Sequence, residues 1–145
     1  MEVLPLWSPL SISIIEIDSI SGYCLYIEAS NPRRKGDRAI LQSPEIYSDS
    51  AACLRFKAHM YSYFKDRMGT LEILMKEKWS KNTKIFTKGG DQGNQWLSYN
   101  VDLPKGGPYK VLIHHYSKFN AEVGYQIMIS FISTIGRHWL NAMIE

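Results

Sequence analysis

An alternation of apolar and polar residues with a period of two constrains the fold of this chain more than any other feature. In residues 53–61, every second side chain after Cys53 is apolar: Leu54, Phe56, Ala58 and Met60. The positions between them hold polar or amphipathic side chains: Arg55, Lys57, His59 and Tyr61. Because successive side chains of a strand point to opposite faces, this pattern predicts a strand with one buried and one polar face.

Similar runs recur along the chain and are separated by turn residues. Strands are predicted around Ile12 and Ile14 and at residues 25–28, 38–41, 71–76, 84–87, 96–102, 109–115 and 125–131. Gly, Pro, Asn and Asp cluster between these runs, where they accept positive φ or fix a turn. About nine strands with almost no amphipathic helix indicate an all-β fold, either an antiparallel sandwich or a barrel.

Size and charge narrow the class of protein. The chain has 145 residues, 45% of them hydrophobic and 21% charged, which fits one globular domain and argues against disorder. Its net charge of +3 is mild. The densest basic run, Arg33-Arg34-Lys35, lies in a turn bounded by Pro and Gly, so no nucleic-acid partner is predicted. No run of 18 apolar residues occurs, so no transmembrane segment is predicted.

The apolar-rich start of the chain does not have the pattern of a signal peptide. Glu2 stands where a positive charge is expected, Pro5 and Pro9 interrupt the apolar run, and no small-x-small cleavage motif precedes Glu16. The two cysteines, Cys24 and Cys53, could form one disulfide or remain two buried thiols.

The histidines do not suggest a metal site. The chain has four: His59, His114, His115 and His138. His114 and His115 are adjacent on a predicted strand, so they face opposite sides and cannot share one metal ion. Neither His-x-x-x-His nor Cys-x-x-Cys spacing occurs. We therefore predict no metal or cofactor and expect solvent-face or rim histidines.

No catalytic constellation can be assembled from the spacing. Cys53 and His59 would lie about 20 Å apart along one strand, too far for a nucleophile–base pair. The glycine-rich residues 89–93 precede a predicted strand rather than a helix, so a hairpin turn is expected there, not a phosphate cradle. The chain is predicted not to be an enzyme.

Several short motifs follow one another in a recognisable order. They are Tyr26-Ile27-Glu28-Ala29-Ser30, Pro32-Arg33-Arg34-x-Gly36-Asp37, Leu41-x-Ser43-Pro44, Cys53-Leu54-Arg55-Phe56, His59-Met60-Tyr61, Gly69-Thr70-Leu71, Gly93-Asn94-Gln95-Trp96 and Val101-Asp102-Leu103-Pro104. This series resembles the MAM domain, an extracellular adhesion module of meprins, neuropilins and some receptor tyrosine phosphatases. The resemblance covers residues 20 to 126 and implies a jelly-roll-like antiparallel β-sandwich.

Both ends of the chain depart from the family pattern. The cysteines that open and close MAM domains are missing, and Gly124-Tyr125 is followed by the uncharged, mostly apolar residues 127–132 instead of acidic ones. That run, uncharged and without proline, is an aggregation hazard if its edge is exposed. We expect a diverged N-terminal segment at residues 1–20, a MAM-like sandwich at 21–135 and a C-terminal tail at 136–145.

The resemblance implies a non-catalytic, extracellular or cell-surface module that binds other proteins, either cell-surface or matrix proteins or a second copy of itself. Candidate contact residues are Arg33, Arg34, Lys35, Tyr61, Tyr63 and Trp79. The aromatic ones are chosen because Tyr and Trp offer large contact area at low entropy cost. The alternative is a carbohydrate-binding, lectin-like jelly roll. Its candidate residues are Asp91, Asn94 and Trp79.

Overall fold

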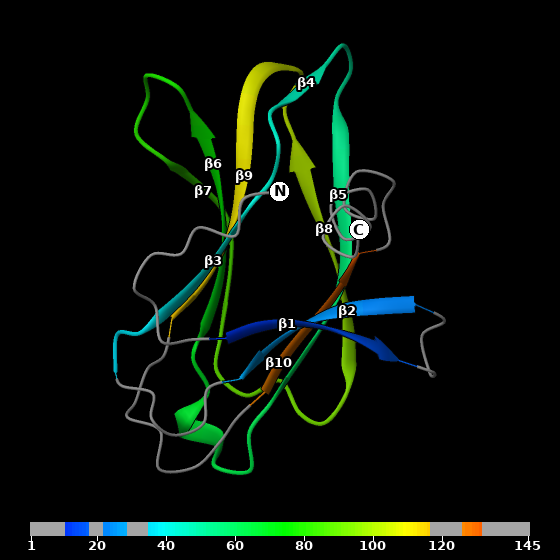
Figure 1. Cartoon of the computed structure of the whole chain (residues 1–145), viewed down its shortest axis with the longest axis vertical. Coiled ribbons are helices and arrows are strands. Elements are labelled where there is room, and N and C mark those ends of the chain that lie inside the picture. The colour runs from blue at the N-terminus through cyan, green and yellow to red at the C-terminus, as the bar shows by residue number, and fades with distance from the viewer. Residues whose placement is uncertain (1–10, 18–21, 29–34, 117–125, 132–145) are drawn as a thin grey trace.

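The computed structural model describes residues 11–17, 22–28, 35–116 and 126–131 as two antiparallel sheets packed face to face (Figure 1). The first sheet has the strand order β1 (Ser11–Ile17), β2 (Gly22–Glu28), β10 (Gln126–Phe131), β5 (Ala52–Tyr61), β8 (Trp96–Leu103). The second has the order β3 (Arg38–Gln42), β9 (Gly106–Tyr116), β6 (Thr70–Glu77), β7 (Thr83–Gly89), and β4 (Ile46–Ser48) also pairs with β9. These sheets confirm the predicted jelly-roll-like β-sandwich.

A short 3-10 turn, η2 (Lys65–Arg67), joins the two sheets between β5 and β6. Within the described residues, no helix has the length and apolar character needed to cross a membrane.

The core between the sheets is built by the alternation seen in the sequence. On β5 the four apolar residues predicted to face inward are buried: Leu54, Phe56, Ala58 and Met60. The Phe56 ring lies 5.5 Å from the ring of Phe86 on the facing sheet, and 5.5 Å and 6.4 Å from Tyr99 and Phe131 on its own sheet. Aromatic contacts at such distances stabilise beyond the area they bury, so Phe56 is the centre of the inter-sheet packing.

The apolar strand β10 has no exposed edge. It pairs with β2 on one side, through Gln126 and Glu28, and with β5 on the other, through Gln126 and Tyr61. Residues 126–129 are therefore paired on both sides and residues 130–131 are paired with β5, so β10 is an inner strand and this part of the run is not an open sheet edge.

Part of the predicted N-terminal segment belongs to the sandwich. Residues 11–17 form β1, which pairs along its whole length with β2 at the edge of the first sheet. Residues 1–10 and the tail at 136–145 lie outside the described residues. The predicted boundaries at residues 20 and 135 stay predictions.

Strand β4 was not anticipated, because three residues are too short to show a period. Ser43 precedes this strand and makes two hydrogen bonds with Val111. The Ser43 Oγ accepts a hydrogen bond from the Val111 N–H at 2.9 Å, and the Ser43 N–H donates to the Val111 carbonyl at 2.9 Å. Pro44 follows and has no N–H to donate. The serine side chain thus continues the ladder on β9 across the break between β3 and β4.

The prediction of solvent-face or rim histidines is wrong for His115. His115 points into the core and is fully buried, while His114 and His59 lie on outer faces yet keep only 7% and 8% of their surface exposed. The opposite facing of His114 and His115 is confirmed, since His115 alternates with core residues of β9. His138 lies outside the described residues.

Cys53 is a free, half-buried cysteine, so it does not form the disulfide with Cys24 that the sequence allowed. The register explains why. Leu25 pairs with Ile129, and Ile129 pairs with Ala58 on the far side, so Cys24 is level with Lys57 of β5. Cys24 is therefore two strands away from Cys53 and displaced from it by four residues along the strand direction. That offset corresponds to a Cα separation of about 16 Å, whereas a disulfide requires less than about 7 Å.

We predict that Phe56→Ala lowers the free energy of unfolding by about 3–5 kcal/mol, because it removes a buried ring and leaves a cavity between the sheets. Urea denaturation followed by tryptophan fluorescence measures the change. Tyr47→Ala is the matched control, since Tyr47 is an exposed ring outside the core, and it should change the value by less than about 0.5 kcal/mol. Equal effects of the two substitutions would contradict the assigned core.

The burial of His115 predicts an acid-sensitive core. Burial lowers the pKa of His115 from 6.5 to about 4, so the folded state keeps the ring neutral while the unfolded state takes up a proton below pH 6.5. Stability should therefore fall as the pH drops from about 7 to about 4, by about 3 kcal/mol for this group. Unfolding measured across this range should show a shallower slope for His115→Asn than for the unchanged chain. An unchanged slope would contradict the burial of a neutral ring.

Candidate functional site

Exposed aromatic residues gather where β5 ends. Tyr61, Tyr63 and Phe64 keep 36%, 79% and 41% of their surface exposed. The rings of Tyr63 and Phe64 meet edge to face at 5.2 Å, and the Arg67 guanidinium lies 5.3 Å from the centre of the Phe64 ring. We call these four residues the aromatic end. They lie beside the 3-10 turn at the end of the molecule opposite β4 (Figure 1).

The backbone beneath the aromatic end is fixed by hydrogen bonds from a buried serine. The N–H of Ser62 donates to Oδ1 of Asp91 at 3.0 Å, and its hydroxyl donates to the Phe64 carbonyl at 2.9 Å. The Arg67 N–H donates to the same Phe64 carbonyl at 2.9 Å. The exposed rings are therefore presented by an ordered turn.

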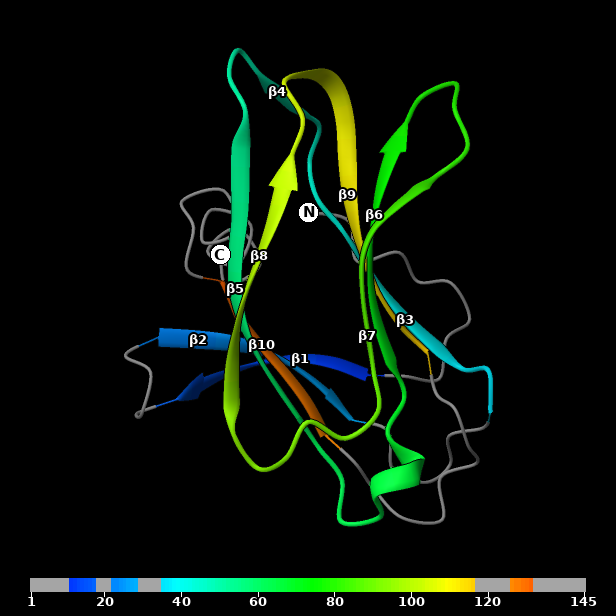
Figure 2. The same ribbon diagram turned by 180° about the vertical axis from the view of Figure 1, so that it is seen from behind.

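Asp91 belongs to a loop, residues 90–95, that crosses from β7 in one sheet to β8 in the other (Figure 2). The predicted hairpin turn at this position is wrong, because β7 and β8 are not paired. The loop is held by the Gln92 N–H, which donates to the Met60 carbonyl at 2.9 Å, and by the Gly90 N–H, which donates to the Gly69 carbonyl at 3.3 Å. Gly90, at a φ of +79°, occupies the left-handed region that glycine tolerates best. We call this segment the crossing loop.

The same loop explains why His59 is buried on an outer face. Its Nε2 shares a hydrogen bond with Oδ1 of Asn94 at 2.9 Å, and its ring lies 5.6 Å from that of Trp96 and 6.2 Å from that of Tyr61. Trp96 is half-buried and packs against the His59 ring on this face. The His59 ring thus joins the aromatic end to the outer face of the first sheet.

The predicted contact residues do not form one surface. Tyr61 and Tyr63 come together, but Trp79, which is 88% exposed, lies after β6 at the opposite end of the sandwich. Lys35 is exposed, and Arg33 and Arg34 lie outside the described residues. Sequence reasoning missed Phe64 and Arg67. The available sequence signal for this surface was Phe64, a large apolar residue inside a polar turn.

The sugar-binding set Asp91, Asn94 and Trp79 is not assembled. Asp91 and Asn94 are in the crossing loop after β7, whereas Trp79 precedes β7, a strand of seven residues. Asp91 and Asn94 also engage Ser62 and His59 in hydrogen bonds, so their oxygens serve the fold. That combination of residues is therefore excluded as one site.

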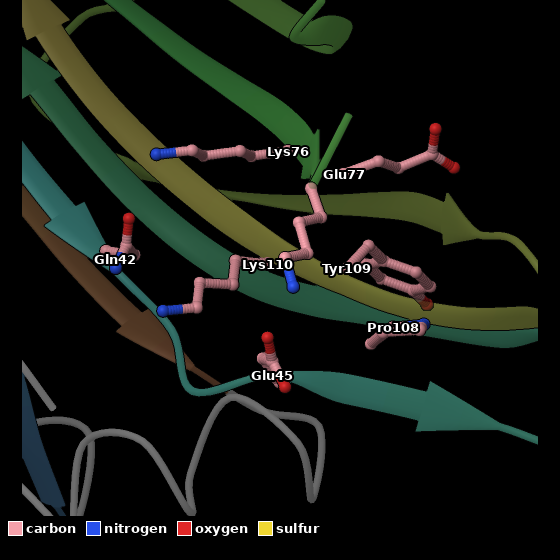
Figure 3. A pocket seen from close by; sticks show the side chains of 8 residues that line it. Gln42, Glu45, Lys76, Glu77, Pro108, Tyr109 and Lys110 are labelled. Atoms are coloured by element: carbon pink, nitrogen blue, oxygen red, sulfur yellow. The ribbon is translucent and has the colours of Figure 1, made fainter. Parts of the chain in front are cut away.

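A pocket of about 250 Å³ lies beside β9 near β4, at the end of the molecule that carries Trp79 (Figure 3). Eight residues line it: Gln42, Glu45, Lys76, Glu77, Lys78, Pro108, Tyr109 and Lys110. Lys76 and Lys110 are paired directly across β6 and β9. The Lys78 ammonium lies 5.0 Å from the centre of the Trp79 ring. We call this feature the lysine pocket.

Several titratable groups lie on the outer face of the second sheet. His114 Nδ1 shares a hydrogen bond with the Tyr116 hydroxyl at 3.0 Å, and Glu72 forms an ion pair with Lys84. Burial lowers the pKa of His114, Glu72 opposes this shift and Arg38 adds to it. Among the described residues, no three His, Cys, Asp or Glu side chains are grouped to hold a metal ion.

Comparison with known proteins identifies the family. The family model described as "MAM domain, meprin/A5/mu" matches residues 12–138. The chain therefore belongs to the MAM family, which confirms the resemblance read from its motifs.

The similar proteins include human MAM domain-containing glycosylphosphatidylinositol anchor protein 1, which is 36% identical over 95 residues, 63% of this chain and 10% of the relative. Neuropilin-1 of Xenopus laevis is 37% identical over 87 residues, 58% of this chain and 9% of the relative. The chain thus spans about a tenth of the length of the curated relatives it matches.

Among solved structures, the K3 cleaved adhesin domain of Lys-gingipain from Porphyromonas gingivalis W83 has a TM-score of 0.60 at 11% identity, covering 77% of this chain and 73% of that chain. At this identity, the likeness supports the fold alone.

We predict that Asp91→Ala loosens the turn under the aromatic end, because it leaves the Ser62 N–H without its acceptor. The cost should be about 1–3 kcal/mol of unfolding free energy, with faster hydrogen exchange of the Ser62 amide. Asp49→Ala is the matched control, because Asp49 is an exposed carboxylate that follows β4. It should change neither the free energy of unfolding nor the exchange rate of the Ser62 amide. Unchanged exchange at Ser62 in Asp91→Ala would contradict the described hydrogen bond.

Proposed function

We propose that this chain is a non-catalytic adhesion-type module that binds another protein through the aromatic end. The observation that carries this proposal is an exposed group of Tyr61, Tyr63 and Phe64 on a turn fixed by hydrogen bonds. Tyrosine and arginine are the residue types most enriched in interface hot spots, and Arg67 completes that composition.

Preorganisation makes the aromatic end better suited to binding than a mobile loop with the same composition. Ordering flexible side chains and loops on binding costs free energy, and a surface that is already ordered avoids part of that cost. Ser62 and the crossing loop hold the backbone before any partner arrives. The Tyr61 ring also contacts the His59 ring, with 6.2 Å between the two ring centres.

The relatives support a location outside the cell. One is named for a glycosylphosphatidylinositol anchor and another is neuropilin-1, and both contain a segment similar to this chain. We infer an extracellular or cell-surface location, with a cell-surface protein, a matrix protein or a second copy of this chain as partner. Lys35 and Trp79 remain predicted contacts, and this proposal rests on neither of them.

The test is binding of the streptavidin-tetramerised domain to animal cells by flow cytometry, with and without prior trypsin treatment of the cells. Trypsin-sensitive binding is expected, and Tyr63→Ser and Phe64→Ser should each weaken it at least about tenfold, as loss of a hot-spot ring does. Sedimentation velocity of the untagged domain separately tests binding between copies.

Tyr47→Ser is the matched control, because Tyr47 is also an exposed tyrosine but lies on β4. It should bind like the unchanged domain. Equal binding by the Tyr63→Ser, Phe64→Ser and Tyr47→Ser variants would overturn the assignment of the aromatic end, and binding that survives trypsin would overturn a protein partner.

A further inference from the structure

We propose that the lysine pocket binds one acidic sugar residue of a glycan, through the carboxylate or sulfate group of that sugar. This site is separate from the aromatic end and does not depend on it, because the two lie at opposite ends of strand β6. Three features of the pocket carry the proposal: an uncompensated pair of lysines, neutral and acidic hydrogen-bonding groups beside them, and an apolar wall.

The lysine pair is unfavourable for the isolated domain. Lys76 and Lys110 are direct cross-strand partners, and both face outward because their neighbours Met75 and Val111 belong to the core. Like charges directly opposite on adjacent strands destabilise a sheet. An anion placed between the two ammonium groups would turn this repulsion into attraction.

The nearby carboxylates do not neutralise the pair. Neither Lys76 nor Lys110 has an ion-pair partner among the described residues, and the Glu77 carboxylate points away from both ammonium groups (Figure 3). Glu45 lines the pocket beyond Lys110 without a salt bridge to it. The positive charge therefore remains available to a ligand.

The other lining groups favour a sugar over other anions. Gln42 and Glu45 offer amide and carboxylate groups to sugar hydroxyls, while the exposed Pro108 provides an apolar wall for a ring face. A polyanion such as a nucleic acid, or a surface of anionic lipids, would bring several charges close to Glu45 and Glu77. A single acid group with neighbouring hydroxyls avoids that repulsion.

The dimensions limit the ligand to about one ring inside the pocket. Its volume of about 250 Å³ is below the range of roughly 300–1,000 Å³ that holds drug-sized ligands. Lys78, which also lines the pocket, connects it to Trp79, whose ring is 88% exposed. This ring offers a flat apolar face to the next sugar of a chain.

The experiment is NMR titration of the folded domain with two acidic probes, 3′-sialyllactose, whose acid group is a carboxylate, and 3′-sulfated lactose, which has a sulfate and no carboxylate, and with lactose as the neutral probe. We expect shifts at the backbone amides of Lys76 and Lys110 with one or both acidic probes and none with lactose. The two probes distinguish a carboxylate from a sulfate as the recognised group. Lys76→Gln and Lys110→Gln should each weaken binding at least about tenfold, as loss of a charged hydrogen bond does.

Lys65→Gln is the matched control, since it removes one exposed lysine at the other end of the molecule and should leave the affinity unchanged. Both pocket variants should also melt at a slightly higher temperature than the unchanged domain, because each removes the repulsion between the two lysines. A lower melting temperature would contradict the claim that the two lysines repel each other. Tyr63→Ser, which alters the aromatic end, should leave sugar binding unchanged. The sugar site and the proposed protein interface can therefore be disproved independently of each other. Absence of shifts with both acidic probes, or equal shifts with lactose, would overturn the sugar site.

Discussion

The rest of the structure depends on the hydrogen bonds by which the crossing loop grips the end of β5. The loop leaves β7 at the edge of one sheet and enters β8 at the edge of the other, so it is one of the covalent links between the two layers. Its Gln92 N–H donates to Met60, and its Asp91 accepts from Ser62. These bonds align the end of the buried strand with the exposed turn. The core and the aromatic end are therefore positioned by the same few residues.

The sandwich separates two surfaces of different chemistry. Strands that run the length of the molecule carry the aromatic end at one terminus and the lysine pocket at the other, with the core around Phe56 between them. The aromatic end is ordered and largely uncharged, which suits a protein interface, whereas the pocket is polar and concave, which suits a small charged group. A domain of this shape can hold a protein partner and a glycan at once, because neither surface uses the residues of the other.

Sequence reasoning was most reliable where a residue's role is decided by its own strand. The alternation in β5 predicted which side chains are buried, and the motifs predicted the family. It failed where distant segments decide. The alternation in β5 places His59 on the polar face, yet Asn94 of the crossing loop and Trp96 of β8 cover it. The pairing of Lys76 with Lys110, which are 34 positions apart in the chain, is likewise set by the register between two strands, so no local pattern reveals the lysine pocket.

The central claim is that the aromatic end is the surface that meets a protein partner. Its most direct test is site-specific photocrosslinking, with p-benzoylphenylalanine replacing Tyr63 in one domain and Tyr47 in another, each tetramerised and bound to intact animal cells. Our account predicts that irradiation links the domain modified at position 63 to a cell-surface protein and leaves the domain modified at position 47 unlinked. Crosslinking from position 47 alone would place the interface at the other end of the sandwich and contradict the account.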